Sequence, residues 1–207
     1  KGLSVLKPLV GVRCDVPADA AVMRVRHGEP GGIVLSEGIL PRLSDFDPGI
    51  MAATGFDLAV RRQVAAGAPL GQIAALDNFC WPDPVRSERT PDGEYKLAQL
   101  VRACRGLHGL CLEYGTPLVS GKDSMKNDST MGGVKISVPP TLLVSAIGQV
   151  TDVRQSVTLE PQESGDVVFL VGTTRDECGG GEYFRYLGDR HGASSPLGQP
   201  RPYVGRN

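Results

Sequence analysis

The clearest pattern of hydrophobic and polar positions lies between residues 97 and 111, where apolar side chains recur at spacings of three and four. This periodicity predicts an amphipathic helix whose apolar stripe faces the core. Thr90-Pro91 or Asp92 supplies its start, and Gly115 followed by Pro117 supplies its end. The predicted stripe consists of Leu97, Leu100, Val101, Cys104, Leu107 and Cys111.

A second helical pattern runs from Ile50 to Ala66. Asp47, directly before Pro48, is placed to cap its N-terminus, and Gly67 ends it. Short apolar runs bounded by glycine and proline predict strands around these helices. The expected strands cover residues 4–6, 9–12, 21–25, 33–35, 72–76, 118–120, 134–138 and 142–150.

The polar segment 162–165 predicts a domain boundary. Residues 1–160 are expected to form one domain, and residues 161–207 the truncated beginning of another. A strand at 167–172 and a short helix at 182–187 are expected there, and the tail after Gly188 is expected to be a loop or a frayed end. Because helices and strands alternate without a regular βαβ repeat, the sequence predicts an α+β fold.

Composition and charge favour a globular protein over a nucleic-acid-binding or membrane protein. Of 207 residues, 41% are hydrophobic and 22% are charged, so a buried core is expected. Lys and Arg number 22 against 23 Asp and Glu, and this balance argues against nucleic-acid or membrane partners. The longest apolar stretch, 141–148, is far shorter than the ~20 residues that span a bilayer. The chain opens with Lys1 rather than Met, which indicates a piece of a longer protein.

The cysteines and histidines show no pattern of a metal or catalytic site. The five cysteines form no C-x-x-C pair, which argues against a disulfide framework or zinc site and favours a reducing, cytoplasmic setting. Cys104 and Cys111 are expected as small core residues of the helix, and His108 as a packed residue. No Ser/His/Asp set is visible, so no catalytic residue is assigned.

The segment Ser120-Gly-Lys-Asp-Ser-Met-Lys-Asn127 is the richest candidate for chemistry. A glycine after a strand lets backbone amides approach an anion, Lys122 supplies a positive charge, and Asp123 can hold magnesium. An ordinary solvated turn explains the same composition, because this segment is not the G-x-x-x-x-G-K-[ST] motif.

Two further segments are weaker candidates. Asp77-Asn78 is expected at the end of a buried strand, where ligands often bind, although an Asx-turn that closes the strand is the favoured interpretation of the pair. The turn Cys178-Gly-Gly-Gly-Glu182 can cradle phosphate at a helix N-terminus or simply be flexible.

Five segments carry a specific combination of motifs, namely Ala74-Ala-Leu-Asp-Asn-Phe-Cys-Trp-Pro-Asp83, Pro91–Cys104, Ser120–Asn127, Gly133–Leu143 and Gly179–Tyr183. In combination they resemble the phosphoribosylformylglycinamidine synthase family, from about residue 34 to 187. The similarity is greatest to the second of the two homologous halves of the synthetase region.

The resemblance implies the fold of the aminoimidazole-ribonucleotide-synthetase superfamily, in which N-terminal domains pair through a shared β-barrel. It implies ATP or ADP with magnesium as cofactor, and as partners the remaining synthetase domains, a glutaminase domain or subunit, and a possible second copy at the barrel edge. Asp123 is the implied metal ligand. The implied nucleotide-binding residues are Asn78, Ser120, Gly121, Lys122, Asp123 and Ser124.

One departure from the family affects the metal. The family's helix commonly reads Asp-Glu-Ala-Val-Arg-Asn, with Glu and Asn facing nucleotide-bound magnesium, whereas this chain has Leu58 and Arg62 at those positions. Leucine cannot bind a metal, and arginine places a positive charge where a cation would lie, although it can meet phosphate directly.

Two functions therefore remain open. The chain is expected to be part of the ATP- and glutamine-dependent ligase that converts formylglycinamide ribonucleotide to formylglycinamidine ribonucleotide in purine biosynthesis, with the fragment alone inactive. The alternative is a non-catalytic half that completes the fold or binds nucleotide in an auxiliary way. The segment Asp77–Trp81 disfavours a free-standing relative such as a thiamine-monophosphate kinase or a selenophosphate synthetase.

Overall fold

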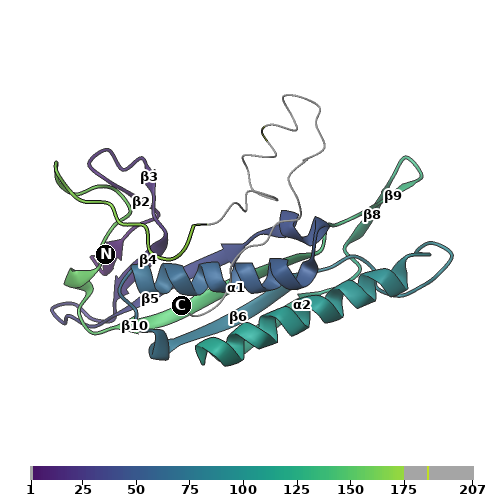
Figure 1. The fold of residues 1–207 in the computed structure, drawn as a ribbon, viewed down its shortest axis with the longest axis horizontal. Coiled ribbons are helices and arrows are strands. Elements are labelled where there is room, and N and C mark those ends of the chain that lie inside the picture. Colours follow the sequence, from purple (N-terminus) through teal and green to yellow (C-terminus); the bar gives the residue numbers. More distant parts are fainter. Residues whose placement is uncertain (1, 175–185, 187–207) are drawn as a thin grey trace.

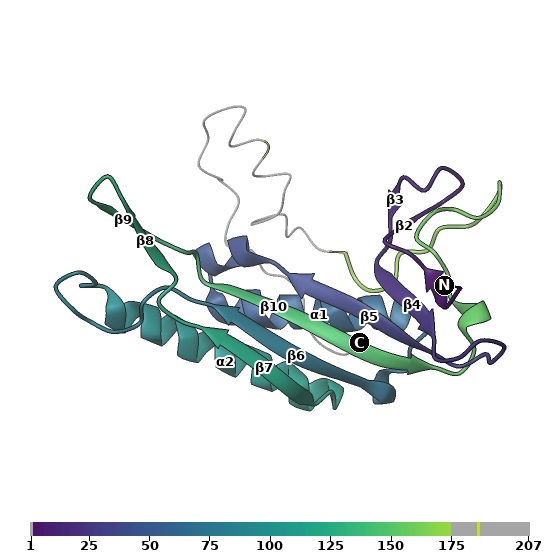
Figure 2. The same cartoon turned by 180° about the vertical axis from the view of Figure 1, so that it is seen from behind.

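A computed structural model describes residues 2–174 and residue 186. The main element is a six-stranded sheet with strand order β1-β4-β5-β10-β6-β7, and two helices cover one of its faces (Figures 1 and 2). The helices are α1 (Pro48–Ala65) and α2 (Gly93–Tyr114). The sheet strands are β1 (Ser4–Leu6), β4 (Ala20–Arg24), β5 (Gly32–Ile39), β6 (Ile73–Cys80), β7 (Leu118–Ser124) and β10 (Thr141–Val150).

Two small hairpins and three 3-10 turns complete the described part. One hairpin joins β2 (Leu9–Val10) to β3 (Val16–Pro17), and the other joins β8 (Asp128–Met131) to β9 (Val134–Ser137). The 3-10 turns are η1 (Pro41–Asp45), η2 (Leu70–Gln72) and η3 (Val153–Gln155). The result is an α+β fold, as the alternation of elements predicts. No helix in the described residues is long and apolar enough to cross a bilayer.

Side chains alternate across the sheet between a helix-covered face and an open face. In β5, Val34 and Ser36 are buried beneath the helices, whereas Leu35 is exposed on the other side. We call the uncovered side the open sheet face. Its partly exposed apolar side chains are Leu35, Ile39, Leu76 and Ile147.

Helix α1 lies unusually close to the sheet because both surfaces carry glycine at the contact. A Cβ added to Gly38 of β5 would overlap the carbonyl oxygen of Gly55 in α1. Nearby, the fully buried Gln63 donates from Nε2 to the carbonyl oxygens of Val34 (3.2 Å) and Ala146 (2.8 Å). The amide thus joins α1 to two neighbouring strands, β5 and β10.

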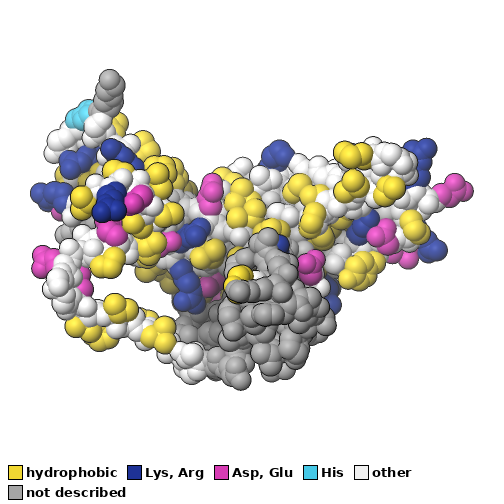
Figure 3. Space-filling model, turned by 90° about the horizontal axis from the view of Figure 1, so that it is seen from above, with side chains coloured by type: hydrophobic (Ala, Val, Ile, Leu, Met, Phe, Trp, Pro, Cys, Tyr) yellow, Lys and Arg dark blue, Asp and Glu magenta, His cyan; other side chains and the backbone are white. Residues whose placement is uncertain are grey.

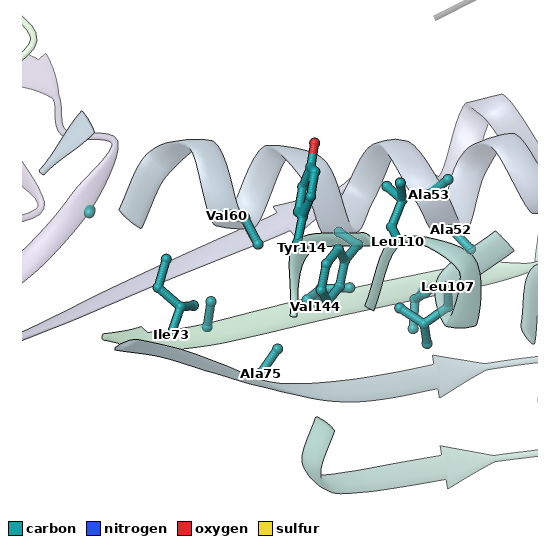
Figure 4. Close-up of a cluster of buried hydrophobic side chains, with 14 of the residues drawn as sticks. Ala52, Ala53, Val60, Ile73, Ala75, Leu107, Leu110, Tyr114 and Val144 are labelled. Atoms are coloured by element: carbon teal, nitrogen blue, oxygen red, sulfur yellow. The ribbon is translucent and has the colours of Figure 1, made fainter. Parts of the chain in front are cut away.

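The two helices are also in close contact with each other. A Cβ on Gly106 of α2 would overlap the Gly49 carbonyl oxygen of α1. Asp57 is buried between the helices, where it accepts hydrogen bonds from Tyr114 and from Arg61 Nε (2.6 Å). Tyr114 lies in the hydrophobic cluster drawn in Figure 4, among side chains of both helices and of the sheet. Since this carboxylate is satisfied on both oxygens, its burial is compatible with a stable core.

The bounds of both helices confirm the sequence prediction, but the buried side of α2 does not. Asp47 caps α1 by accepting from the backbone N–H of Gly49 (2.7 Å), and Gly115 ends α2 in the left-handed conformation. The predicted core positions Cys104 and His108 are exposed, and Cys111 is half-buried. The buried side chains of α2 are Lys96, Ala103, Leu107, Leu110 and Tyr114.

The predicted stripe is rotated because α2 is apolar on more than one side, and α1 selects the side that is buried. Leu97 and Val101, at i and i+4, remain 48% and 43% exposed. Ala103 and Leu107 face the core instead, since the small side chain of Ala103 and the nearby Gly106 allow the backbones to approach.

Several strand predictions also need correction. The strand predicted at 33–35 spans Gly32–Ile39, and the one predicted at 9–12 ends at Val10. The strand predicted at 72–76 continues to Cys80, and the one predicted at 118–120 continues to Ser124, because β6 and β7 pair along their whole length. The strand predicted at 167–172 is wrong, since no described residue pairs with this segment and its side chains are exposed. An isolated extended segment has no partner for its backbone hydrogen bonds. The helix predicted at 182–187 and the tail fall almost entirely outside the described residues.

The glycine contact between β5 and α1 predicts a position-specific loss of stability. Gly38→Ala should lower the free energy of unfolding by about 1–3 kcal/mol, because the methyl group must displace the α1 backbone. The matched control is Gly71→Ala, whose added Cβ has open space and should change stability by less than about 0.5 kcal/mol. Urea denaturation followed by tryptophan fluorescence of Trp81 measures both. Equal stability of the two variants would contradict the close approach.

Candidate functional site

The residues expected to bind nucleotide lie on two adjacent parallel strands. α2 connects β6 to β7, and this crossover makes them the one parallel pair of the sheet (Figure 1). The register places Asp77 opposite Gly121 and Asn78 opposite Lys122. Asp77-Asn78 is therefore inside a strand, not at its end, and Ser120–Ser124 is itself a strand, not the loop or turn that the sequence suggested.

Strand alternation separates the predicted set onto two sides. Phe79 is buried beneath the helices, so its partner Asp123 lies on the helix side, as do Asp77 and Gly121. Leu76 marks the open sheet face. The predicted residues on that open face are Asn78, Ser120, Lys122 and Ser124.

Lys122 is available to a ligand at the edge of the sheet. β7 pairs with β6 alone among the described strands, and its residues 118–123 are all exposed. The Lys122 ammonium donates a hydrogen bond to the Ser124 hydroxyl, which holds the charge over the strand. An ammonium group, two hydroxyls and the amide of Asn78 can together donate several hydrogen bonds to an anion such as a phosphate.

The helix side of the same two strands is acidic. Partial burial raises the pKa of Asp77, and the negative charge of Asp123 raises it further. A side chain at Gly121 would collide with the Asp77 carboxylate, so Asp77 lies directly over the backbone of β7. Burial also raises the pKa of Cys111 to about 11, with the charge of Asp77 adding to the effect, so this thiol is not an activated nucleophile.

The positions at which the chain departs from the family lie elsewhere. Arg62 reaches from α1 to β5, where its Nη1 donates to the Glu37 carbonyl oxygen (2.7 Å) and its Nε lies 3.5 Å from an Asp19 carboxylate oxygen. Glu37 pairs with Ser145 of β10 on one side, and β4 begins at Ala20, opposite Ser36, so Arg62 binds Glu37 on the side that β4 does not reach. It borders a hollow of about 550 Å³ lined also by Leu35 and Ser145. Two strands, β10 and β6, separate β5 from β7. The structure thus does not bring Arg62 and Lys122 into one site.

The described residues contain no group of three or more His, Cys, Asp or Glu side chains placed to hold a metal ion. Asp123 has Asp77 as its acidic neighbour, and Leu58 contributes no ligand. One or two carboxylates are nevertheless a common protein contribution to magnesium, when nucleotide phosphates and water complete the octahedron. The pair is therefore compatible with a nucleotide-bound magnesium ion but not with a site made by this chain alone.

The sequence missed one polar cluster entirely. Asp128 accepts a hydrogen bond from the Asp83 backbone N–H (3.1 Å) and forms an ion pair with Lys135 (3.1 Å). Lys135 also donates to the Thr90 hydroxyl (2.6 Å). The only signal in the sequence was the alternation of the strand containing Lys135, which does not reveal its partners. Cys178–Glu182, the other predicted phosphate site, lies outside the described residues.

Residues 17–150 match the family model described as AIR synthase related protein, N-terminal domain. The chain is 30% identical to phosphoribosylformylglycinamidine synthase subunit PurL of Methanocaldococcus jannaschii over 82% of its length, and 33% identical to that of Alkaliphilus metalliredigens over 80%. It spans only about a fifth of each relative, 22% and 21%.

Solved structures of PurL from Thermotoga maritima are similar to the described fold. One is a complex with ADP, at a TM-score of 0.53 and 27% identity. Another is a complex with FGAR, at a TM-score of 0.53 and 25% identity. Each match covers 70% of this chain and 21% of the other.

The proximity of Asp77 and Asp123 predicts that substituting Asp77 changes the melting temperature in a pH-dependent way. Because the folded state raises the pKa of Asp77 above its ordinary 3.8, ionising Asp77 opposes folding. Asp77→Asn should raise the melting temperature at pH 7 by about 1–3 °C, a small shift because solvent screens a partly exposed pair. The difference from the unsubstituted chain should shrink as pH falls and vanish below about 3.8, the ordinary pKa of the carboxyl. Calorimetric melts between pH 3.5 and 7 test this, and a less stable Asp77→Asn at pH 7 would contradict it.

Proposed function

Because the chain belongs to the family of AIR synthase related proteins by its N-terminal domain, we propose that it is part of a phosphoribosylformylglycinamidine synthase. The whole enzyme would convert formylglycinamide ribonucleotide to formylglycinamidine ribonucleotide with ATP and glutamine. Within it, residues 1–160 form the N-terminal domain of one synthetase half, and residues 161–207 begin the C-terminal domain of that half.

The observation that carries this proposal is the exposed cation on the β7 edge. Lys122 is flanked by the hydroxyls of Ser120 and Ser124, and Asn78 lies beside it on β6. We assign these four residues, with the Gly121 backbone, to the phosphates of ATP or ADP. A nearby positive charge and neutral donors stabilise phosphate more than either alone. The complexes of the Thermotoga maritima relative with ADP and AMPPCP support a nucleotide as the ligand.

Asp123 is the proposed magnesium ligand, and Asp77 its neighbour. When bound, magnesium would neutralise charge on the nucleotide phosphates. Asp123 lies on the helix side of β7 and Lys122 on the open side, so the two residues would contact a nucleotide from opposite sides of this edge strand. No residue of this chain is assigned to catalysis itself.

A second function, an auxiliary or structural half, is favoured by Arg62. Its guanidinium is engaged by the Glu37 carbonyl oxygen and lies beside Asp19, so it stabilises the end of β5. This is a structural use of a position at which the family places a group facing nucleotide-bound magnesium. The auxiliary half would bind nucleotide without turning it over, and a purely structural half would complete the fold with no nucleotide at Lys122.

We propose that the open sheet face pairs with the equivalent face of a second N-terminal domain, either a homologous half or another copy. Its exposed apolar side chains, Leu35, Ile39, Leu76 and Ile147, are 38–45% exposed and would be buried by such a partner. The remaining synthetase domains and a glutaminase domain or subunit would complete the enzyme.

Calorimetric titration with ADP and ATP, with and without magnesium, tests the nucleotide site. Lys122→Ala should weaken binding by about tenfold or more, because it removes the positive charge from the phosphates. Lys126→Ala is the matched control, since Lys126 is exposed and forms its ion pair with Asp83 (3.7 Å), and it should bind as the unsubstituted chain does.

The outcomes separate the alternatives. Magnesium-dependent binding lost in Asp123→Asn would support Asp123 as a ligand. If Lys122→Ala and the unsubstituted chain bind nucleotide with equal affinity, Lys122 does not contact the nucleotide and the β7 segment is an ordinary solvated strand. Nucleotide binding without hydrolysis would favour the auxiliary half.

A further inference from the structure

Two oxygen atoms from different segments of the chain converge on the guanidinium group of Arg62. Asp19, between β3 and β4, places a carboxylate oxygen 3.5 Å from Nε. The Glu37 carbonyl oxygen of β5 accepts a hydrogen bond from Nη1 (2.7 Å). Arg62 therefore joins α1 to two segments that lie outside it. Acidic and basic side chains lie side by side at this end of the molecule, near the β2–β3 hairpin (Figure 3).

The hydrogen bonding of Arg62 is incomplete at this place. Its Nε is shielded from solvent and has no hydrogen-bond acceptor among the described residues, although the Asp19 carboxylate is near. A buried donor without an acceptor costs free energy, so hydrogen bonds alone are a poor reason for an arginine here. The positive charge of the guanidinium, which is permanent and lies beside the negative charge of Asp19, is the better physical reason.

The oxygen atoms around Arg62 are of the kind that bind divalent metal ions. Magnesium and calcium prefer carboxylate and backbone carbonyl oxygens, which are what Asp19 and Glu37 offer. Positions 58 and 62 are four residues apart, so they share one side of α1, where the family places Glu and Asn. In this chain the two positions do not fit magnesium, because Leu58 has no ligand atom and the Arg62 guanidinium repels a cation.

The two departures from the family together conserve charge. A Glu and an Asn side chain around a divalent ion carry one net positive charge, and Leu58 with Arg62 carries the same charge without an ion. We infer that Arg62 is a built-in cation, a side chain that replaces a divalent metal ion between α1, Asp19 and the Glu37 carbonyl oxygen. This end of α1 is therefore held without metal. The inference goes beyond the proposed function and uses neither Lys122 nor Asp123.

Charge, not lack of space, excludes a metal ion from this place. The hollow of about 550 Å³ beside Arg62 is also lined by Asp19 and Glu37, so a hydrated ion has room to reach their oxygen atoms. The Arg62 side chain is 34% exposed and Asp19 40% exposed, so solvent also reaches the pair. Removing the positive charge and returning ligand atoms to α1 should therefore be enough to admit a metal ion.

Metal binding tests the inference, with manganese(II) as the probe because it takes oxygen ligands as magnesium does. Leu58→Glu combined with Arg62→Asn should bind manganese(II) at least tenfold more tightly than the unsubstituted chain, measured from the EPR signal of the free ion. The matched control, Leu58→Gln combined with Arg62→Asn, lacks the added carboxylate and should bind at least tenfold more weakly than the first variant. Adding Asp19→Asn to the first variant should also abolish its gain.

Melting temperatures in EDTA test the built-in cation without any metal. Arg62→Asn should lower the melting temperature by about 1–3 °C, a small shift because the ion pair with Asp19 is partly exposed. Arg62→Lys keeps the positive charge and should lose less than half as much. The unsubstituted chain should melt at the same temperature in EDTA and in magnesium chloride.

Three results would overturn the inference. If the unsubstituted chain binds manganese(II) and Asp19→Asn abolishes that binding, Arg62 does not exclude the metal. If Leu58→Glu with Arg62→Asn folds but gains no affinity for manganese(II), the oxygen atoms of Asp19 and Glu37 are not a cation-binding set. If Arg62→Lys melts as low as Arg62→Asn, the positive charge is not what stabilises this end of α1, and this result does not require the double variant to fold. None of the three bears on nucleotide binding at Lys122.

Discussion

The close packing of α1 between the sheet and α2 is the interaction on which the remaining structure depends. Gly38 and Gly55 bring helix and sheet backbones together, and Gly106 does the same between the two helices. Gln63 then reaches the carbonyl oxygens of two strands from inside the core. Because interiors are packed without voids, this arrangement commits one face of the sheet to the helices. It also leaves the opposite face without any cover from the described chain.

The candidate site follows from how α2 returns the chain to the sheet. A crossover helix makes β7 parallel to β6 and places it at the sheet edge, where Lys122 is exposed. The same register puts Asp77 and Asp123 together on the helix side. Partial burial of like charges opposes folding, so the negative charges of these carboxylates destabilise the folded state. Such an electrostatic cost is typical of residues at binding sites, which agrees with the cation proposed at Asp123.

Several surfaces of the described chain are apolar and have no packing partner among the described residues. The open sheet face exposes apolar side chains that protein surfaces usually disperse, and residues 167–171 are exposed and pair with no strand in the described part of the chain. The chain spans about a fifth of its relatives. These surfaces agree with the proposal that the chain is one component of a longer protein.

The sequence by itself determined what depends on neighbours along the chain. The ends of α1 and α2 were predictable because Asp47 and Gly115 act through local backbone geometry, and strand β10 because its apolar run is nearly continuous. Tertiary structure alone decided which side of α2 is buried, since α2 is apolar on several sides. Only pairing between distant strands could show that Asn78 and Lys122 share a face, that Asp123 does not, and that Arg62 lies beyond two further strands. Such non-local contacts have no local periodicity, and the alternation of residues in a strand predicts two faces without saying which one is covered.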